Sequence, residues 1–196
     1  LSLRETGLLF MSLESAEMTK YAANAFLATK ITFINEIADL SERVGADVKD
    51  IAKGIGLDGR IGSKFLHAGP GYGGSCFPKD TLALARIGQA HNTPVRIVET
   101  VIDVNEARKR RMVDKILDAL GGRLADRRLA VFGVTFKPET DDMRAAPSLT
   151  IVPALIGGGA AVTVCDPQGR KEGEALLPGV RWEHDPYAAA RGADAV

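Results

Sequence analysis

Residues Ser15 to Val44, SAEMTKYAANAFLATKITFINEIADLSERV, continue without a glycine or proline up to Gly45. Apolar residues in this stretch recur every three or four positions, which gathers them on one face of a helix. They are Met18, Tyr21, Ala22, Ala25, Phe26, Ile31, Ile34, Ile37, Ala38 and Leu40. We therefore expect one long helix that ends at Gly45. Its alanines would let another helix approach closely; they are Ala22, Ala23, Ala25 and Ala28.

Further helices are expected up to residue 120. A short helix from Asp47 to Lys53 should end at Gly54, and the glycine-rich residues 54–74 should form a loop that contains one turn of helix. Pro78 suits the first turn of a helix that continues to about His91, because proline is tolerated there. Pro94 should open another long helix that reaches Leu120.

The composition changes after the Gly121-Gly122 pair. Residues 128–134 and 161–165 are short apolar runs typical of buried strands, and residues 147–155 between them suit a helix. A strand, a helix and a strand at this spacing indicate a βαβ unit with a parallel sheet. The predicted fold class is therefore an α-helical central domain, residues 1–121, followed by a partial, Rossmann-like α/β domain, residues 122–196.

Both ends of the chain resemble cuts in a longer protein. The sequence begins at Leu1 without a methionine, and it stops at Gly192-Ala193-Asp194-Ala195-Val196. That last run reads as a glycine at a helix end followed by the first residues of a strand. We expect the chain to be part of a larger polypeptide.

Charge and composition exclude several classes of protein. The 25 basic and 25 acidic residues of the 196-residue chain cancel, so no excess of positive charge favours nucleic acid as a partner. No apolar run reaches the length of about 20 residues that a membrane span needs, and residues 1–10 lack the pattern of a cleavable signal. The two cysteines form no CxxC or metal-ligand cluster, so we expect no metal site and a reduced, cytoplasmic setting.

The segment most suggestive of chemistry runs from Gly69 to Asp80 and reads GPGYGGSCFPKD. Cys76 lies just before Pro78, hence beside the N-terminus of a predicted helix, whose positive end favours a thiolate. This dipole contributes only about 0.3–1 kcal/mol, so a nearby cation should also be required. The plainer interpretation is a small, buried and inert cysteine after a tight turn.

Several motifs together resemble the UDP-glucose/GDP-mannose dehydrogenase family. The segment from Gly73 to Asp80, GGSCFPKD, is similar to the active-site signature of that family. The other matches lie at Ala16–Leu27 (AEMTKYAANAFL), Phe33–Glu36 (FINE), Gly59–Gly62 (GRIG), Phe132–Lys137 (FGVTFK) and Thr140–Arg144 (TDDMR). The resemblance covers about residues 15 to 170, in the order and spacing of the family.

The resemblance implies an NAD-dependent oxidoreductase that converts the C6 alcohol of UDP-glucose to the carboxylate of UDP-glucuronate, with release of two hydrides. Cys76 would capture the aldehyde as a thiohemiacetal, which becomes a thioester and is hydrolysed. The motifs look most similar to the UDP-glucose branch, and GDP-mannose is the alternative substrate. The family carries its main NAD-binding domain before the central helix, and we expect that domain to lie outside this chain.

The same resemblance assigns roles to residues by their positions. Lys20 and Asn24, four apart on one helix face, would stabilise an oxyanion, and Asp80 would accept a proton or orient water during hydrolysis. Lys79 and Arg144 would contact NAD. The substrate-binding positions would be Arg60, which reaches the substrate of a neighbouring subunit, Phe65, Leu66, His67, Ala68, Gly69, Gly73 and Lys137. Each has a plainer alternative, such as a solvated lysine, a residue that favours a helix start, or a polar loop histidine.

Residues Gly54 to Gly59, GIGLDG, satisfy the GxGxxG spacing of a dinucleotide-binding loop. Such a loop should follow a strand and open a helix. This one follows a predicted helix and precedes Arg60, so we interpret it as an ordinary loop.

Two other classes of function remain open. A cysteine hydrolase or acyl transferase would pair Cys76 with one of the histidines His67, His91 and His184, none of which lies in a recognisable motif. A non-catalytic dimerisation module would use the alanine-rich helix, through which the resembled family forms homodimers.

Overall fold

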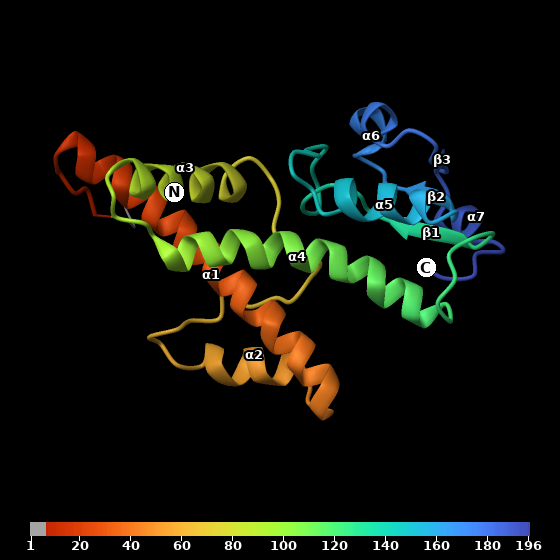
Figure 1. Ribbon diagram of the computed structural model, residues 1–196, viewed down its shortest axis with the longest axis horizontal. Coiled ribbons are helices and arrows are strands. Elements are labelled where there is room, and N and C mark those ends of the chain that lie inside the picture. The colour runs from red at the N-terminus through yellow and green to blue at the C-terminus, as the bar shows by residue number, and fades with distance from the viewer. Residues whose placement is uncertain (1–6) are drawn as a thin grey trace.

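The computed structural model describes residues 7–196, which form a helical part and an α/β part (Figure 1). The helical part contains α1 (Leu13–Val44), α2 (Val48–Gly56), α3 (Phe77–Ala90) and α4 (Arg96–Ala119). The α/β part contains β1 (Arg128–Phe132), α5 (Ser148–Gly157), β2 (Ala161–Cys165), α6 (Arg170–Leu176), β3 (Arg181–Trp182) and α7 (Pro186–Ala190). The predicted fold class is confirmed. Of the N-terminal residues in which we looked for a signal, 1–6 lie outside the described part.

The long helix α1 begins and ends where the sequence supplies capping residues. The Ser12 hydroxyl accepts a hydrogen bond from the Ser15 amide at 3.2 Å, which satisfies a free N–H of the first turn. At the other end, Gly45 adopts a φ of 75°, a left-handed conformation that glycine enters at little cost. Within residues 7–196, neither this helix nor any other combines the length and the apolar character needed to cross a bilayer.

Small residues on α1 bring α3 and α4 close to it. Ala25 packs with Leu84 of α3 and Val98 of α4, and Ala28 packs with Tyr72 and Val101 in a second cluster. These alanines therefore face helices of the same chain. Ala22 and Ala23, in contrast, are exposed.

The region after α1 differs in detail from the prediction. Gly54 and Gly56 lie inside α2, which continues three residues beyond the predicted end at Lys53. Residues 57–76 form a loop without a continuous helix, and the Gly62 amide donates to the Asp58 carbonyl at 2.8 Å, so the loop contains one isolated helical turn, as expected. The GxGxxG spacing thus begins in the last turn of α2 and follows no strand. It therefore does not form a dinucleotide-binding loop.

The sheet of the α/β part is parallel, with strand order β1-β2-β3. β1 pairs with β2 from Arg128↔Ala161 to Phe132↔Cys165, and α5 forms the crossover between them, which confirms the βαβ unit. On the other edge of β1, Leu129 forms one parallel bridge with Ala195. The predicted strand at the end of the sequence is thus present as a single bridge.

Helix α4 belongs to both cores (Figure 1). Its N-terminal half carries Val98 and Val101, which pack in the helical part. Its C-terminal half contributes side chains to the core of the α/β part; they are Val113, Ile116 and Leu117. The two parts are therefore joined by a continuous helix.

We predict that Leu155→Ala lowers the free energy of unfolding by about 2–5 kcal/mol, because the side chain is only 1% exposed in the α/β core and leaves a cavity. Leu176→Ala is the control, since that side chain is 48% exposed and its loss should cost no more than about 1 kcal/mol. Urea unfolding measures both. Equal losses would contradict this description of the core.

Candidate functional site

Cys76 is the residue that immediately precedes α3, and its side chain is exposed. The Asp80 amide donates to the Cys76 carbonyl at 2.9 Å, which places the cysteine at the start of the first helical turn. No side chain caps this helix, and Pro78 lies in its first turn. The Ser75 hydroxyl lies 3.8 Å from the Cys76 sulfur. The thiol is therefore open to a reactant and close to the positive end of a helix.

A chain of polar contacts runs from α1 to α3 beside this cysteine. The Lys20 ammonium group donates to the side-chain oxygen Oδ1 of Asn24 at 3.4 Å. The Asn24 amide nitrogen donates to one oxygen of Asp80, and the Lys79 ammonium group lies 2.5 Å from the other. The predicted residues Lys20, Asn24, Asp80 and Lys79 are thus brought together, from positions far apart in the sequence.

Asp80 is a charged group held in the interior, with 2% of its surface exposed. Burial by itself raises the pKa of the carboxyl group. The hydrogen bonds from Lys79 and Asn24, together with the charges of Lys79 and Lys20, outweigh burial and hold the pKa below its usual value. Asp80 is therefore a carboxylate near neutral pH.

Two exposed cations, Lys79 and Arg144, interact through their charges with Cys76. The pKa of Lys79 is raised first by its hydrogen bond and charge interaction with Asp80, and further by Tyr21 and Cys76. The pKa of Arg144 is raised first by its hydrogen bond and charge interaction with Asp142, and further by Cys76. Lys20, the cation that the family resemblance would place near the thiol, has a charge that acts on Asp80.

A cleft of about 460 Å³ lies next to the start of α3. Its walls come from α1, the loops before α3 and the loop after β1. They are formed by Ile31, Lys64, Phe65, His67, Gly71, Tyr72, Gly73, Phe77, Phe136 and Lys137. Four predicted substrate positions, Phe65, His67, Gly73 and Lys137, thus line one space. The Lys137 ammonium group lies 5.3 Å from the centre of the Phe136 ring, which holds the cation at the rim.

The other predicted substrate positions lie elsewhere. Leu66 is buried, and together with Ala68 it lines a second cleft of about 430 Å³ against α2. Gly69 is bonded through its main chain to α1 and α4. Arg60 is exposed and ion-paired to Asp58, so it lies apart from the cleft of its own chain.

The loop before Cys76 is docked tightly against the α/β part. The Gly74 amide donates to the Arg144 carbonyl at 2.7 Å. A Cβ atom on Gly73 would lie 2.5 Å from the Ala145 carbonyl oxygen, and one on Gly74 would lie 2.7 Å from the Phe136 ring. Glycine is thus required at both positions because the neighbouring backbone and ring leave no room.

The side chains of α1 and α4 that hold this loop were not predicted from the sequence. The Asn105 carboxamide accepts from the Tyr72 amide at 2.8 Å and donates to the Tyr72 carbonyl at 3.2 Å. Asn35 and Arg108 hold Gly69 in the same manner. A signal was available, because Asn105 and Arg108 continue the three-and-four spacing of Val98 and Val101 and are polar residues at core positions.

Asp166 was also missed, and it fixes the opposite wall of the cleft. Its carboxylate accepts hydrogen bonds from the amides of Val134 and Gly169, both at 2.7 Å. Burial raises the pKa of Asp166, but these backbone donors outweigh burial and lower it overall. The loop after β1, which carries Phe136 and Lys137, is therefore anchored to the end of β2.

Two family models match the chain. Residues 14–107 match the central domain of the UDP-glucose/GDP-mannose dehydrogenase family, and residues 130–196 match the UDP binding domain of the same family. The matched ranges contain Cys76 with the Lys20–Asn24–Asp80 contacts in the first model, and Lys137 and Arg144 in the second.

Two curated relatives match all or nearly all of this chain and are much longer than it. A UDP-glucose 6-dehydrogenase of Rhizobium meliloti (strain 1021) is 58% identical over 196 residues, which are all of this chain and 45% of that protein. A UDP-glucose 6-dehydrogenase of Bacillus subtilis (strain 168) is 52% identical over 94% of this chain and 40% of its own length. The chain thus spans less than half the length of these curated relatives.

A solved structure has the same fold. The UDP-glucose dehydrogenase of the hyperthermophilic archaeon Pyrobaculum islandicum superposes with a TM-score of 0.91 and is 40% identical in sequence. The match covers 95% of this chain and 43% of that one. The arrangement of the helical and α/β parts is therefore shared with a protein of that name.

We predict that Asp80→Asn lowers the free energy of unfolding at pH 7 by about 1–3 kcal/mol, because the buried Asn24 carboxamide and the exposed Lys79 ammonium group lose their charged acceptor. The folded pKa of Asp80 is depressed, so its stabilisation is complete above the pKa of an unfolded aspartate, about 3.9. The difference between variant and wild type should shrink below that pH and vanish as the pH passes the folded pKa.

Asp126→Asn is the matched control, since that carboxylate is exposed and pairs with Arg123 at the surface. Urea unfolding at several pH values measures both variants. A difference for Asp80→Asn that stays constant between pH 7 and pH 2 would contradict the ionic role of the carboxylate.

Proposed function

The chain belongs to the UDP-glucose/GDP-mannose dehydrogenase family, and from this we propose that it is the catalytic-thiol and nucleotide-binding part of an NAD-dependent enzyme that oxidises UDP-glucose to UDP-glucuronate. The observation that carries the proposal is the exposed Cys76 at a helix start, beside a cleft and the Lys20–Asn24–Asp80 contacts. UDP-glucose is favoured as the substrate because the named relatives are UDP-glucose 6-dehydrogenases.

The sugar nucleotide would lie in the cleft between the two parts of the chain. Phe65 and Phe77, whose rings meet edge to face at 6.0 Å, offer an apolar wall. Lys137 offers a positive charge at the rim, which suits an anionic diphosphate or a sugar hydroxyl. Arg60 has no place in this cleft, and its exposed position is consistent with reaching the substrate of a second subunit.

The chain also has residues that suit NAD near the thiol. Lys79 and Arg144 are exposed cations close enough to act on Cys76, and such cations fit the diphosphate of a dinucleotide. Two NAD molecules, bound one after the other, would each accept one of the two hydrides that oxidation of an alcohol to a carboxylate releases. We propose that these side chains orient each NAD from the thiol side.

Cys76 would capture the aldehyde covalently. The thiolate sulfur forms a bond to the aldehyde carbon, and the electron pair of the C=O bond moves to the oxygen. The ammonium group of Lys20 and the amide of Asn24 would stabilise this oxygen, because donors fixed in advance act without reorganisation. Loss of a hydride from the same carbon leaves a thioester.

Hydrolysis releases the product and restores the thiolate. Water adds to the thioester carbon, the C–S bond breaks, and the electron pair of that bond returns to sulfur. Asp80 is ionised, and each of its oxygens keeps a further lone pair after bonding to Lys79 and Asn24. We propose that Asp80 orients this water or accepts its proton.

The hydrolase hypothesis receives less support from the geometry. A cysteine hydrolase would need a histidine bonded to the thiol. His67 lines the cleft, but within residues 7–196 no hydrogen bond joins a histidine to Cys76. His184 instead bonds to Arg170 and, through its carbonyl, to Cys165.

We also propose that the chain forms a homodimer through α1. Large apolar side chains remain exposed along this helix; they are Phe26, Phe33, Leu40 and Val44. The seven-residue spacing of Phe26, Phe33 and Leu40 gathers them on one face, opposite the alanines that meet α3 and α4.

A domain boundary near Gly121, with residues 1–121 and 122–196 on either side, remains part of the proposal, although α4 contributes to both cores.

We expect Cys76→Ser, in the whole enzyme that contains this chain, to reduce turnover of UDP-glucose by about a thousandfold or more, as removal of a covalent nucleophile does. Absorbance of NADH measures turnover, and UDP-glucose binding should be largely retained. Cys165→Ser is the control, because that thiol, at the last residue of β2, donates to the His184 carbonyl, and a serine hydroxyl can do the same. Full activity of Cys76→Ser would refute the mechanism, and turnover with GDP-mannose alone would refute the substrate.

Phe33→Glu should convert the dimer to a monomer, because it places a charge in the centre of the exposed apolar face, where Phe33 is 50% exposed. Sedimentation velocity of the chain measures its mass. Ile97→Glu alters a side chain that is 70% exposed at the start of α4 and should leave the dimer intact. A Phe33→Glu chain of unchanged mass would remove α1 from the interface.

A further inference from the structure

The loop before the reactive thiol is held through its main chain by side chains from two helices. Both the N–H and the C=O of Gly69 and of Tyr72 are bonded in this way. The Gly69 amide donates to the Asn35 side chain at 2.8 Å, and the Gly69 carbonyl accepts from Arg108 at 2.9 Å. Asn105 holds Tyr72 through two bonds. The conformation of residues 69–74 is therefore set from outside the loop.

Arg108 is the charged member of this group, and it is 8% exposed. Its Nε atom donates a hydrogen bond to the Gly69 carbonyl. Its Nη1 atom lies 3.4 Å from the Asn35 carbonyl and donates to the Asp39 carboxylate. One planar guanidinium group thus joins the loop to two successive turns of α1. A single ammonium group cannot reproduce this fork of donors.

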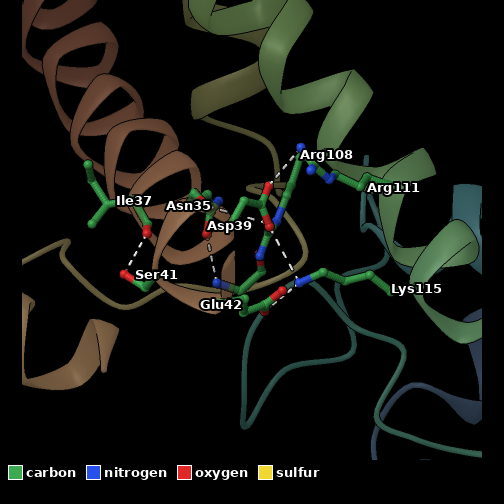
Figure 2. Close-up of polar contacts among 9 residues, drawn as sticks. Asn35, Ile37, Asp39, Ser41, Glu42, Arg108, Arg111 and Lys115 are labelled. Carbon is green, nitrogen blue, oxygen red and sulfur yellow. Dashed lines mark hydrogen bonds and ion pairs between the residues drawn. The ribbon is translucent and has the colours of Figure 1, made fainter. Parts of the chain in front are cut away.

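Asp39 lies at the centre of a larger ionic cluster (Figure 2). Arg111 lies 3.3 Å and Lys115 3.4 Å from its carboxylate, and Lys115 also pairs with Glu42 at 2.5 Å. These cations come from successive turns of α4, whereas Asp39 and Glu42 come from α1. Arg108 is distinguished from the other cations of the cluster because it also contacts the loop.

The partners of Arg108 give it a role beyond joining α1 to α4. An unpaired buried charge is costly, so the guanidinium group must keep both Asp39 and its carbonyl acceptors. Residues Gly71, Tyr72 and Gly73, which follow Gly69, line the cleft, and Cys76 comes directly after the loop. Gly71 lies between Gly69, which Arg108 holds, and Tyr72, which Asn105 holds, so a shift of the Gly69 carbonyl would distort the cleft wall at Gly71.

We infer that Arg108, ion-paired to Asp39, is a positioning residue that fixes the cleft wall at Gly71–Gly73 through its bond to the Gly69 carbonyl. This inference rests on the proposed function for the identity of the ligand in the cleft. It does not depend on that function for the mechanical role of Arg108. The positioning acts on the sugar-nucleotide side of the site, since the loop lines that cleft.

Arg108→Lys in the chain tests the mechanical role. The lysine retains the charge for Asp39 but cannot also hold the Gly69 carbonyl, so amide hydrogen exchange at Gly69 and Tyr72 should become faster by roughly tenfold or more. Exchange at Leu84, in the core of α3, should stay unchanged. Arg111→Met is the matched control, because Arg111 also pairs with Asp39 but is 50% exposed on its side chain and has no bond to the loop.

The functional arm uses the whole enzyme with both substrates. Arg108→Lys should raise the KM for the sugar nucleotide about tenfold, the scale of one charge-assisted hydrogen bond, with little change in the KM for NAD, and Arg111→Met should alter neither. Unchanged exchange at Gly69 and Tyr72 in Arg108→Lys would overturn the inference, as would equal acceleration in Arg111→Met. If the wild-type enzyme does not oxidise UDP-glucose, the proposed function fails, while the exchange experiment still decides the role of Arg108.

Discussion

The geometry of the site depends on the pair of hydrogen bonds between the Asn105 carboxamide and the peptide groups of Tyr72. A loop with glycine at 69, 71, 73 and 74 has many conformations available and no helix or strand to select one. Asn105 is buried, so leaving its donor and acceptor unpaired would cost more than the bonds themselves contribute. The loop is therefore confined to one conformation, and that conformation sets the positions of Cys76 and of the cleft wall.

Helix α4 extends this constraint across the molecule. Its middle presents Asn105 and Arg108 to the loop and to α1, and its last turns pack into the core of the α/β part. The loop itself meets the α/β part at Gly73 and Gly74, where no side chain would fit. The helix and the loop thus join the same two parts at separate places, which fixes Phe136 and Lys137 relative to the wall that faces them.

Local patterns explain which features the sequence could predict. The long helix α1 and the helix start at Pro78 follow from residues close together in the chain, and both are present. β3 consists of Arg181 and Trp182, and it exists because β2 offers a partner, so no local pattern could indicate it. The same holds for Arg108, whose polar side chain at a core position of α4 signalled an internal partner without saying that the partners were Asp39 and a loop carbonyl.

The distribution of charge around Cys76 separates two tasks that conflict in a single residue. A reactive thiol must be accessible, and an accessible group gains little from nearby charges because water screens them. Here the thiol is exposed, while the carboxylate of Asp80 is buried and already matched by Lys79 and Asn24. The Asp80 carboxylate therefore lies in the medium of lower dielectric, where α1 and α3 maintain its orientation, while the ammonium group of Lys79 pairs with it from the surface. Cys76 can therefore stay open to a ligand, while the polar groups beside it, Lys20, Asn24 and Asp80, are already ordered before the reaction begins.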